Sequence, residues 1–221
     1  MNNHSIFSLI MTTHHNFIRV DSIKNTWGKH INHLVYGDYE DLNKNIIKVS
    51  NDYTYHSNEE KQINCLNILK QRYSSILDSY DWILLADDDT FINYKLIFEM
   101  IKNFDEDKVY GYVLNEITDN DNAIRKNTNI PLNFSYIAGG NGCFISTKLI
   151  KKINLFKNYK LGYSDVSLGF NFMHNDIKLE HINNCCRYYS KLDTQYNISN
   201  LYSFHYVTDD NSMMFLYNLI R

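Results

Sequence analysis

Proline and glycine are scarce in this chain of 221 residues, which contains one proline, Pro131, and eight glycines. This composition excludes a collagenous repeat and a proline-rich linker. Apolar runs are short as well, and none reaches the roughly 20 residues that span a bilayer. The apolar segment 5–11 also lacks the basic flank and the small-residue cleavage site of a signal peptide. We therefore expect no membrane span, in either an intracellular protein or a domain of a longer, anchored one.

Cysteines are few, and their positions favour neither a zinc site nor a disulfide framework. The four are Cys65, Cys143, Cys185 and Cys186; none forms a C-x-x-C pair, and adjacent cysteines rarely bridge each other. Basic charge is not in excess either, because the net charge is -3 and the isoelectric point is near 6.3. Since nucleic-acid binding requires a basic face, we expect no nucleic-acid partner.

Apolar residues, in contrast, are abundant: 44% of the chain is hydrophobic and 14% is aromatic, enough for one packed domain over 1–221. Short apolar runs alternate with segments of helical periodicity. This alternation predicts an α/β fold with a mixed, mostly parallel central sheet flanked by helices. We expect strands at 6–11, 34–36, 46–49, 82–86 and 109–114, and helices around 18–27, after 57, over 93–104, after 147 and near 165.

Local signals refine this prediction. Ser57 with Glu60 has the spacing of a capping box, and Thr147 is placed to cap a later helix. A strand pair around Tyr136 and Phe144 is expected to bracket a glycine-rich segment. The polar segment 115–135 is long for a connection inside a domain, and such loops are usually functional lids or disordered segments. We expect a flexible lid there.

The most informative segment is 81–93, where an apolar strand ends in Asp87, Asp88 and Asp89. A buried strand that stops in acid places carboxylates at the sheet edge, where α/β proteins bind ligands. Alternate strand residues face opposite sides, so Asp87 and Asp89 are expected to share a face while Asp88 points away. Oxygen ligands favour Mg²⁺ or Mn²⁺, which usually serves a phosphate-bearing substrate. This segment alone also fits a solvated acidic turn, a phosphatase or a nucleotidyltransferase.

Three further segments carry residues that could take part in chemistry. Gly139, Gly140 and Gly142 lie in a β context, where glycines either let the backbone approach a ligand or form a hairpin turn. Asp165 stands where a helix should begin, and a plain N-cap would explain it. His205 follows an aromatic residue, and a histidine in that position is more often structural than a metal ligand.

Taken in order, these segments resemble the Fringe-like glycosyltransferases, including the Fringe β-1,3-N-acetylglucosaminyltransferases and the core 1 β-1,3-galactosyltransferases. The similarity extends from about Ile6 to His205 and consists of five motifs. They are Thr12 and Thr13 followed by Arg19, Thr26 and Trp27; the segment 82–93, with Asn93 four places after Asp89; the Gly-Gly-x-Gly loop at 138–142; the Asp-x-x-x-Gly motif at 164–169; and the late pair Phe204 and His205.

The resemblance implies a GT-A fold, a UDP-sugar donor, Mn²⁺ or Mg²⁺, a glycan or glycosylated protein as acceptor, and inversion with a β-1,3 linkage. It assigns roles to the residues that match the motifs. Asp89 and His205 would ligate the metal beside Asp87, while Asp87 and Asp88 would flank the ribose and sugar. The donor would be contacted by Thr12, Thr13, Arg19, Gly139 and Gly140. Asp165 would be the general base, and the lid 115–135 would lie on the acceptor side.

The sequence departs from the family at two points. Ser164 stands where the family often has a second acid, which could alter acceptor binding. Animal members are anchored in the Golgi and disulfide-bonded, whereas this chain has no anchor and few cysteines. It is therefore expected in the cytoplasm as it stands, or in the Golgi lumen if it is cut from an anchored protein. Two other functions stay open: an inactive UDP-sugar- or glycan-binding module, and a phosphatase or nucleotidyltransferase that uses the Asp triplet alone.

Overall fold

The computed structural model describes residues 5–115, 135–157, 163–191 and 197–221, so nearly all of the predicted lid lies outside the described residues. The helices and strands are, in order, β1 (Ile6–Met11), α1 (Phe17–Asn25), β2 (His33–Gly37), β3 (Ile46–Lys48), α2 (Asn58–Arg72), α3 (Ser74–Ser79), β4 (Trp82–Asp87), β5 (Phe91–Ile92), α4 (Tyr94–Met100), β6 (Lys108–Gly111), β7 (Val113–Leu114), β8 (Tyr136–Ile137), β9 (Cys143–Ser146), α6 (Thr147–Lys152), α7 (Ser164–His174), β10 (Lys178–His181), β11 (Cys185–Cys186), β12 (Ser203–Phe204) and α8 (Asp210–Ile220).

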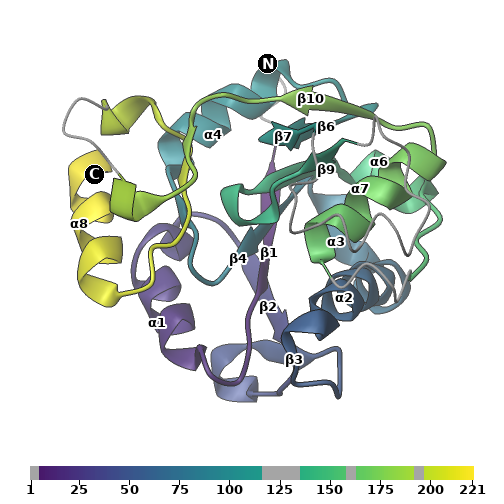
Figure 1. Ribbon diagram of the computed structural model, residues 1–221, viewed down its shortest axis with the longest axis horizontal. Helices are drawn as coiled ribbons and strands as arrows, with labels where there is room; N and C mark the ends of the chain where they lie inside the picture. The colour runs from purple at the N-terminus through teal and green to yellow at the C-terminus, as the bar shows by residue number, and fades with distance from the viewer. Residues whose placement is uncertain (1–4, 116–134, 158–162, 192–196) are drawn as a thin grey trace.

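A central sheet runs through the molecule (Figure 1). Over the described residues it has seven strands in the order β10-β6-β9-β4-β1-β2-β3. The strand β9 is antiparallel to both of its neighbours, β4 and β6, and the other pairs are parallel. The predicted α/β class with a mixed, mostly parallel sheet is therefore confirmed.

Helices cover both faces of the sheet. In Figure 1, α1, α4 and α8 lie on one side, and α2, α3, α6 and α7 lie on the other. The strand β4 supplies both cores, because Trp82 and Leu84 pack into one cluster while Ile83 and Leu85 pack into the second. Burial on both faces explains why this strand is apolar throughout rather than alternating. None of the helices in the described ranges is long and apolar enough to cross a membrane.

Neither predicted capping bond forms, although Ser57 does occupy the N-cap position of α2. The hydroxyl of Ser57 donates to the carbonyl of Thr54 at 2.6 Å and accepts no bond from the first turn of α2. The helix α6 is capped one residue earlier than predicted, because Ser146 Oγ accepts a hydrogen bond from the amide of Leu149 at 3.0 Å. Thr147 Oγ1 instead donates to the carbonyl of Tyr80 at 2.8 Å, a partner that sequence spacing does not reveal.

Two predicted strand assignments also need correction. The expected strand 109–114 breaks at Tyr112 into β6 and β7, which belong to different sheets. The segments around Tyr136 and Phe144 do not pair with each other, because β8 pairs with β7 while β9 joins the central sheet. The chain turns between them at Gly142, whose φ of 86° favours glycine.

Short pairings bring the C-terminal segment back to the end of β4. The strand β12 lies between β5 and β11 in a three-stranded sheet of the described residues. Just beyond it, the amide of Val207 donates to the carbonyl of Asp89 at 2.9 Å. Residues more than a hundred positions apart thereby meet at one edge of the central sheet.

Gly169 sets the distance between α7 and β8. A Cβ at this position would lie 2.5 Å from the Cβ and 3.0 Å from the Cα of Tyr136. We expect Gly169→Ala to lower the free energy of unfolding by up to about 2 kcal/mol in urea titrations, because overpacking of about 1–3 kcal/mol outweighs the helix-propensity gain of about 1 kcal/mol.

The matched control is Gly139→Ala, whose added Cβ would meet only the Cβ of Asp165, at an ordinary 3.5 Å. Its unfolding free energy should change by less than about 0.5 kcal/mol. Unchanged or increased stability of Gly169→Ala would show that α7 and β8 do not depend on this close approach.

Candidate active site

The three adjacent aspartates lie at a turn rather than along a strand. The strand β4 ends at Asp87, and the amide of Thr90 donates to the carbonyl of Asp87 at 3.1 Å. Two buried bonds hold this turn: Thr90 Oγ1 donates to the carbonyl of Gly140 at 2.8 Å, and Trp27 Nε1 donates to the carbonyl of Thr90 at 3.0 Å. The directions of the three carboxylates are therefore fixed by the surrounding core.

Asp87 and Asp89 converge on His205. One ligand atom from each of these three side chains lies within 4.8 Å of the others, and no other such cluster occurs in the described ranges. The imidazole Nε2 of His205 lies 3.4 Å from Asp89 Oδ1. Two carboxylates and one imidazole form a donor set that suits Mn²⁺ or Mg²⁺, so the residues fit the predicted metal.

Gly140 makes room for His205. A Cβ at position 140 would lie 2.1 Å from the imidazole ring. The backbone of the histidine is fixed as well, because its amide donates to the carbonyl of Cys186 at 2.9 Å. The second glycine of the predicted loop thus has a packing reason: it lets the ring lie against the backbone beside the aspartates.

Burial raises the pKa of Asp87 to about 7, and the neighbouring charge of Asp89 adds to the shift. In the absence of a cation, two carboxylates this close oppose each other's ionisation. A bound divalent ion reverses that balance, since it favours the ionised form of both.

Asp88 has a different environment from its neighbours. It is buried, accepts a hydrogen bond from Thr12 Oγ1 at 2.7 Å and pairs with the Arg19 guanidinium at 3.1 Å. Burial raises the pKa of Asp88 to about 6, although both partners oppose this shift. Its carboxylate therefore connects β4 to the end of β1 and to α1, on the side away from His205.

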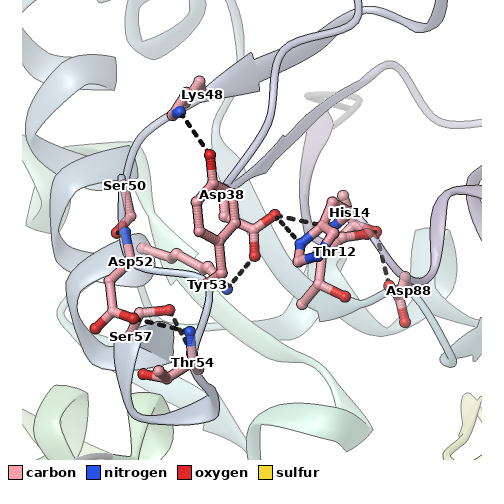
Figure 2. A network of polar contacts seen from close by, with 12 residues as sticks. Thr12, His14, Asp38, Lys48, Ser50, Asp52, Tyr53, Thr54, Ser57 and Asp88 are labelled. Carbon is pink, nitrogen blue, oxygen red and sulfur yellow. Dashed lines mark hydrogen bonds and ion pairs between the residues drawn. The ribbon is translucent and has the colours of Figure 1, made fainter.

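A second buried ion pair lies nearby, and Figure 2 shows its aspartate, Asp38, beside His14, with Thr12 and Asp88 next to them. Lys61 Nζ lies 2.9 Å from Asp38 Oδ2, and both side chains are completely buried. The other oxygen of Asp38 accepts a hydrogen bond from the backbone amide of His14 at 2.8 Å. Burial alone would raise the pKa of Asp38, but the bonds to Lys61 and His14 outweigh it and hold the pKa below its usual value. No sequence pattern marks this pair, because its members lie 23 positions apart in unrelated elements.

Asp165 lies in the first turn of α7, one residue inside the helix, and the N-cap position is Tyr163. The plain N-cap interpretation of Asp165 is therefore wrong. One of its oxygens accepts a hydrogen bond from the amide of Val166 at 2.9 Å. A helix N-terminus favours the ionised form of a carboxylate.

These residues surround a cavity of about 310 Å³ at the carboxyl edge of the sheet. Its lining includes Thr13, Arg19, Asp87, Asp88, Asp89, Gly139, Gly140, Asp165 and His205. Thr12 is buried behind this lining and contacts it through Asp88. The structure thus brings together the residues that the motifs singled out; their roles remain predictions.

The cavity also has lining residues that the motifs did not indicate: Asn16, Tyr55, Asn58, Tyr163 and Tyr206. Among them, Tyr55 and Tyr163 are in edge contact, with ring centroids 6.1 Å apart. No pattern of spacing marks such residues, because each belongs to a loop or helix end that only the fold brings to the cavity.

A sequence profile of the Fringe-like family matches residues 1–185, which is most of the chain. The chain belongs to the Fringe-like family. No curated protein matches the sequence.

Solved structures add evidence on the fold. A glycosyltransferase involved in the glycosylation of the major capsid of PBCV-1 is 14% identical, with 96% of this chain and 99% of that chain covered and a TM-score of 0.51. The WbbM bifunctional glycosyltransferase is 12% identical, with 97% of this chain and 50% of that chain covered and a TM-score of 0.51. At these identities the likeness concerns the fold, and it confirms the predicted GT-A architecture.

If Asp87 ligates the predicted metal, its raised pKa should make metal binding depend on pH. A metal ligand must be deprotonated, so protons compete with Mn²⁺ below about pH 7. We expect the Mn²⁺ affinity, measured by isothermal titration calorimetry, to fall by up to about tenfold per pH unit between pH 7 and pH 6.

Asp87→Asn should bind Mn²⁺ more weakly at pH 8 and should show a shallower pH dependence. Equal Mn²⁺ affinity at pH 6 and pH 8 in the unsubstituted protein would contradict this assignment.

Proposed function

We propose that this Fringe-like protein transfers a sugar from a UDP-sugar donor to an acceptor hydroxyl, with inversion at the anomeric carbon. One observation carries the proposal. A single cavity is lined both by the cluster of Asp87, Asp89 and His205 and by a separate carboxylate, Asp165, at a helix N-terminus. An inverting transfer needs these two functions: charge stabilisation for the leaving group, and a base for the incoming hydroxyl.

The donor's diphosphate is proposed to lie beside the metal cluster. Mn²⁺, or Mg²⁺ in its place, would be held by Asp89, His205 and Asp87, and would stabilise the negative charge that develops on the leaving UDP. Arg19 lies 3.9 Å from Asp89 and extends the positive charge along the same wall. Gly139 and Gly140 present backbone without side chains to the cavity, which allows the donor to approach closely.

Asp165 is the proposed general base. As the acceptor oxygen forms a bond to the anomeric carbon, Asp165 takes the hydroxyl proton, and the bond from that carbon to the phosphate oxygen breaks with its electron pair leaving on UDP. A base in hydrogen-bond reach contributes roughly 10²–10⁴-fold. A retaining enzyme would need no base at this place. The β-1,3 linkage and a glycan or glycosylated protein acceptor are proposed from the family resemblance.

Asp165→Asn tests the proposal directly. The amide cannot accept the proton, so transfer measured as product formation should fall by about 10²–10⁴-fold. Binding of UDP with Mn²⁺, measured by calorimetry, should remain unchanged because the metal cluster is intact.

The matched control is Asp210→Asn, since Asp210 also lies in the first turn of a helix but does not line the cavity. Its activity should equal that of the unsubstituted protein. Near-full turnover by folded Asp165→Asn would exclude the base assignment. Binding of UDP with Mn²⁺ but no product from any donor and acceptor would instead indicate an inactive binding module.

A further inference from the structure

A second cavity of about 150 Å³ adjoins the cavity of about 310 Å³ that is proposed to hold the donor. The two share Gly139, Gly140, Asp165, His205 and Tyr206 in their linings. The proposed base therefore stands where the cavities meet, and a hydroxyl group can reach it from the second one while the donor occupies the first. The second cavity is additionally lined by Arg187 and Tyr188, which the sequence motifs did not indicate.

Backbone pairing holds Arg187 and Tyr188 beside the metal cluster. The amide of Tyr189 donates to the carbonyl of His205 at 2.9 Å, and the amide of His205 donates to the carbonyl of Cys186 at 2.9 Å. Asn141 Nδ2 also donates to the carbonyl of Cys186, at 3.2 Å. The position of Arg187 thus follows from a ladder that starts at the proposed metal ligand.

The guanidinium of Arg187 lies over two aromatic rings. Its central carbon is 5.1 Å from the ring centroid of Tyr112 and 5.5 Å from that of Tyr188. No carboxylate of the described residues lies within ion-pair distance of it, while three aspartates line the neighbouring cavity. Rings that flank a guanidinium hold its plane and leave its edge N–H groups to donate, which is the geometry that recognises a carboxylate or a sulfate.

Tyr206 provides an aromatic surface at the same place. Its ring stacks on Tyr188 at 5.4 Å with an interplanar angle of 3°, and on His205 at 3.9 Å. Its backbone φ is 62°, in the left-handed region that a bulky residue rarely adopts. Tyr206 is 47% exposed, so this unfavourable conformation presents a large ring to solvent at the cavity wall. Exposed rings of this kind bind the apolar faces of ligands.

We propose that the cavity lined by Arg187, Tyr188 and Tyr206 binds an acceptor sugar that carries an anionic group, with the sugar ring against the tyrosines and the anion on Arg187. The inference rests on the proposed function, because it names the acceptor class of that site. The charges also set the orientation: an anion is repelled by Asp165 and attracted by Arg187, so the acceptor enters with its neutral hydroxyl toward the base.

Matched glycosides test this proposal. The probes are p-nitrophenyl galactoside and glucoside, the corresponding galacturonide and glucuronide, and the 6-sulfated galactoside. Their binding to the protein with Mn²⁺ and UDP is measured by ligand-observed NMR titration, which requires no turnover. We expect at least one acidic glycoside to bind about tenfold more tightly than its neutral counterpart. Preference for the uronides or for the sulfate identifies which anion the site accepts.

Substitutions at two positions separate the two parts of the site. Arg187→Gln should remove the preference for the acidic member while leaving the neutral glycoside unchanged, and Arg187→Lys should retain part of it. Tyr206→Ala should weaken the binding of the acidic glycoside and of its neutral counterpart to the same extent. Arg72→Gln is the same substitution at an exposed position outside both cavities, and it should change the binding of neither the acidic nor the neutral glycoside.

Three results would overturn the inference: no acidic glycoside binds, acidic and neutral members bind equally, or Arg187→Gln retains the preference. In a parallel experiment, UDP release from a panel of UDP-sugars is measured in the presence of the same glycosides. Acidic glycosides that bind through Arg187 without any UDP release would contradict the proposed function while supporting the binding site.

Discussion

The site depends on how the fold separates three adjacent carboxylates. Three aspartates at the end of a buried strand repel one another and would destabilise the sheet edge if they shared one environment. The turn after β4 divides them. Asp88 is directed to Thr12 and Arg19, while Asp87 and Asp89 face His205. One carboxylate is thus neutralised by the protein itself, and the other two form a cluster that a divalent cation can neutralise.

Much of the surrounding structure holds this division in place. The turn is bonded to Trp27 on one side and to Gly140 on the other, and the C-terminal segment adds His205 through its pairing with Cys186. Gly140 has no side chain because the imidazole occupies that space. The same C-terminal ladder carries Tyr206 and positions Arg187, so the two cavities are built on one set of backbone bonds.

The sequence predicted the central strands well, because burial on both faces leaves a continuous apolar run such as 82–86 that has few other interpretations. It failed in two situations. In one, a local hydrogen bond or strand break depends on backbone geometry; in the other, the interacting residues lie far apart in the sequence. The caps at Ser57 and Thr147 and the break at Tyr112 depend on backbone geometry that spacing does not encode. The expected grouping of Asp87 with Asp89 came from strand alternation, whereas the structure achieves it with a turn.

The buried Asp38–Lys61 pair shows the other kind of failure. Lys61 lies near the start of the helix α2, where a lysine is usually exposed, and only the fold shows that its partner is Asp38, directly after β2. Arg187 was missed for a similar reason, since the rings around it come from separate segments. The family motifs marked residues near the proposed chemistry, whereas the residues that shape the proposed acceptor side belong to no motif.

We propose that the cluster of Asp87, Asp89 and His205 serves metal-dependent transfer from a nucleotide sugar. The first measurement is UDP release from a panel of UDP-sugars with the glycoside acceptors present, in Mn²⁺ and in EDTA. We expect at least one donor to release UDP, and this release to stop in EDTA and in Asp89→Ala. Release that is unaffected by EDTA and by this substitution, or release of phosphate or pyrophosphate in place of UDP, would contradict it.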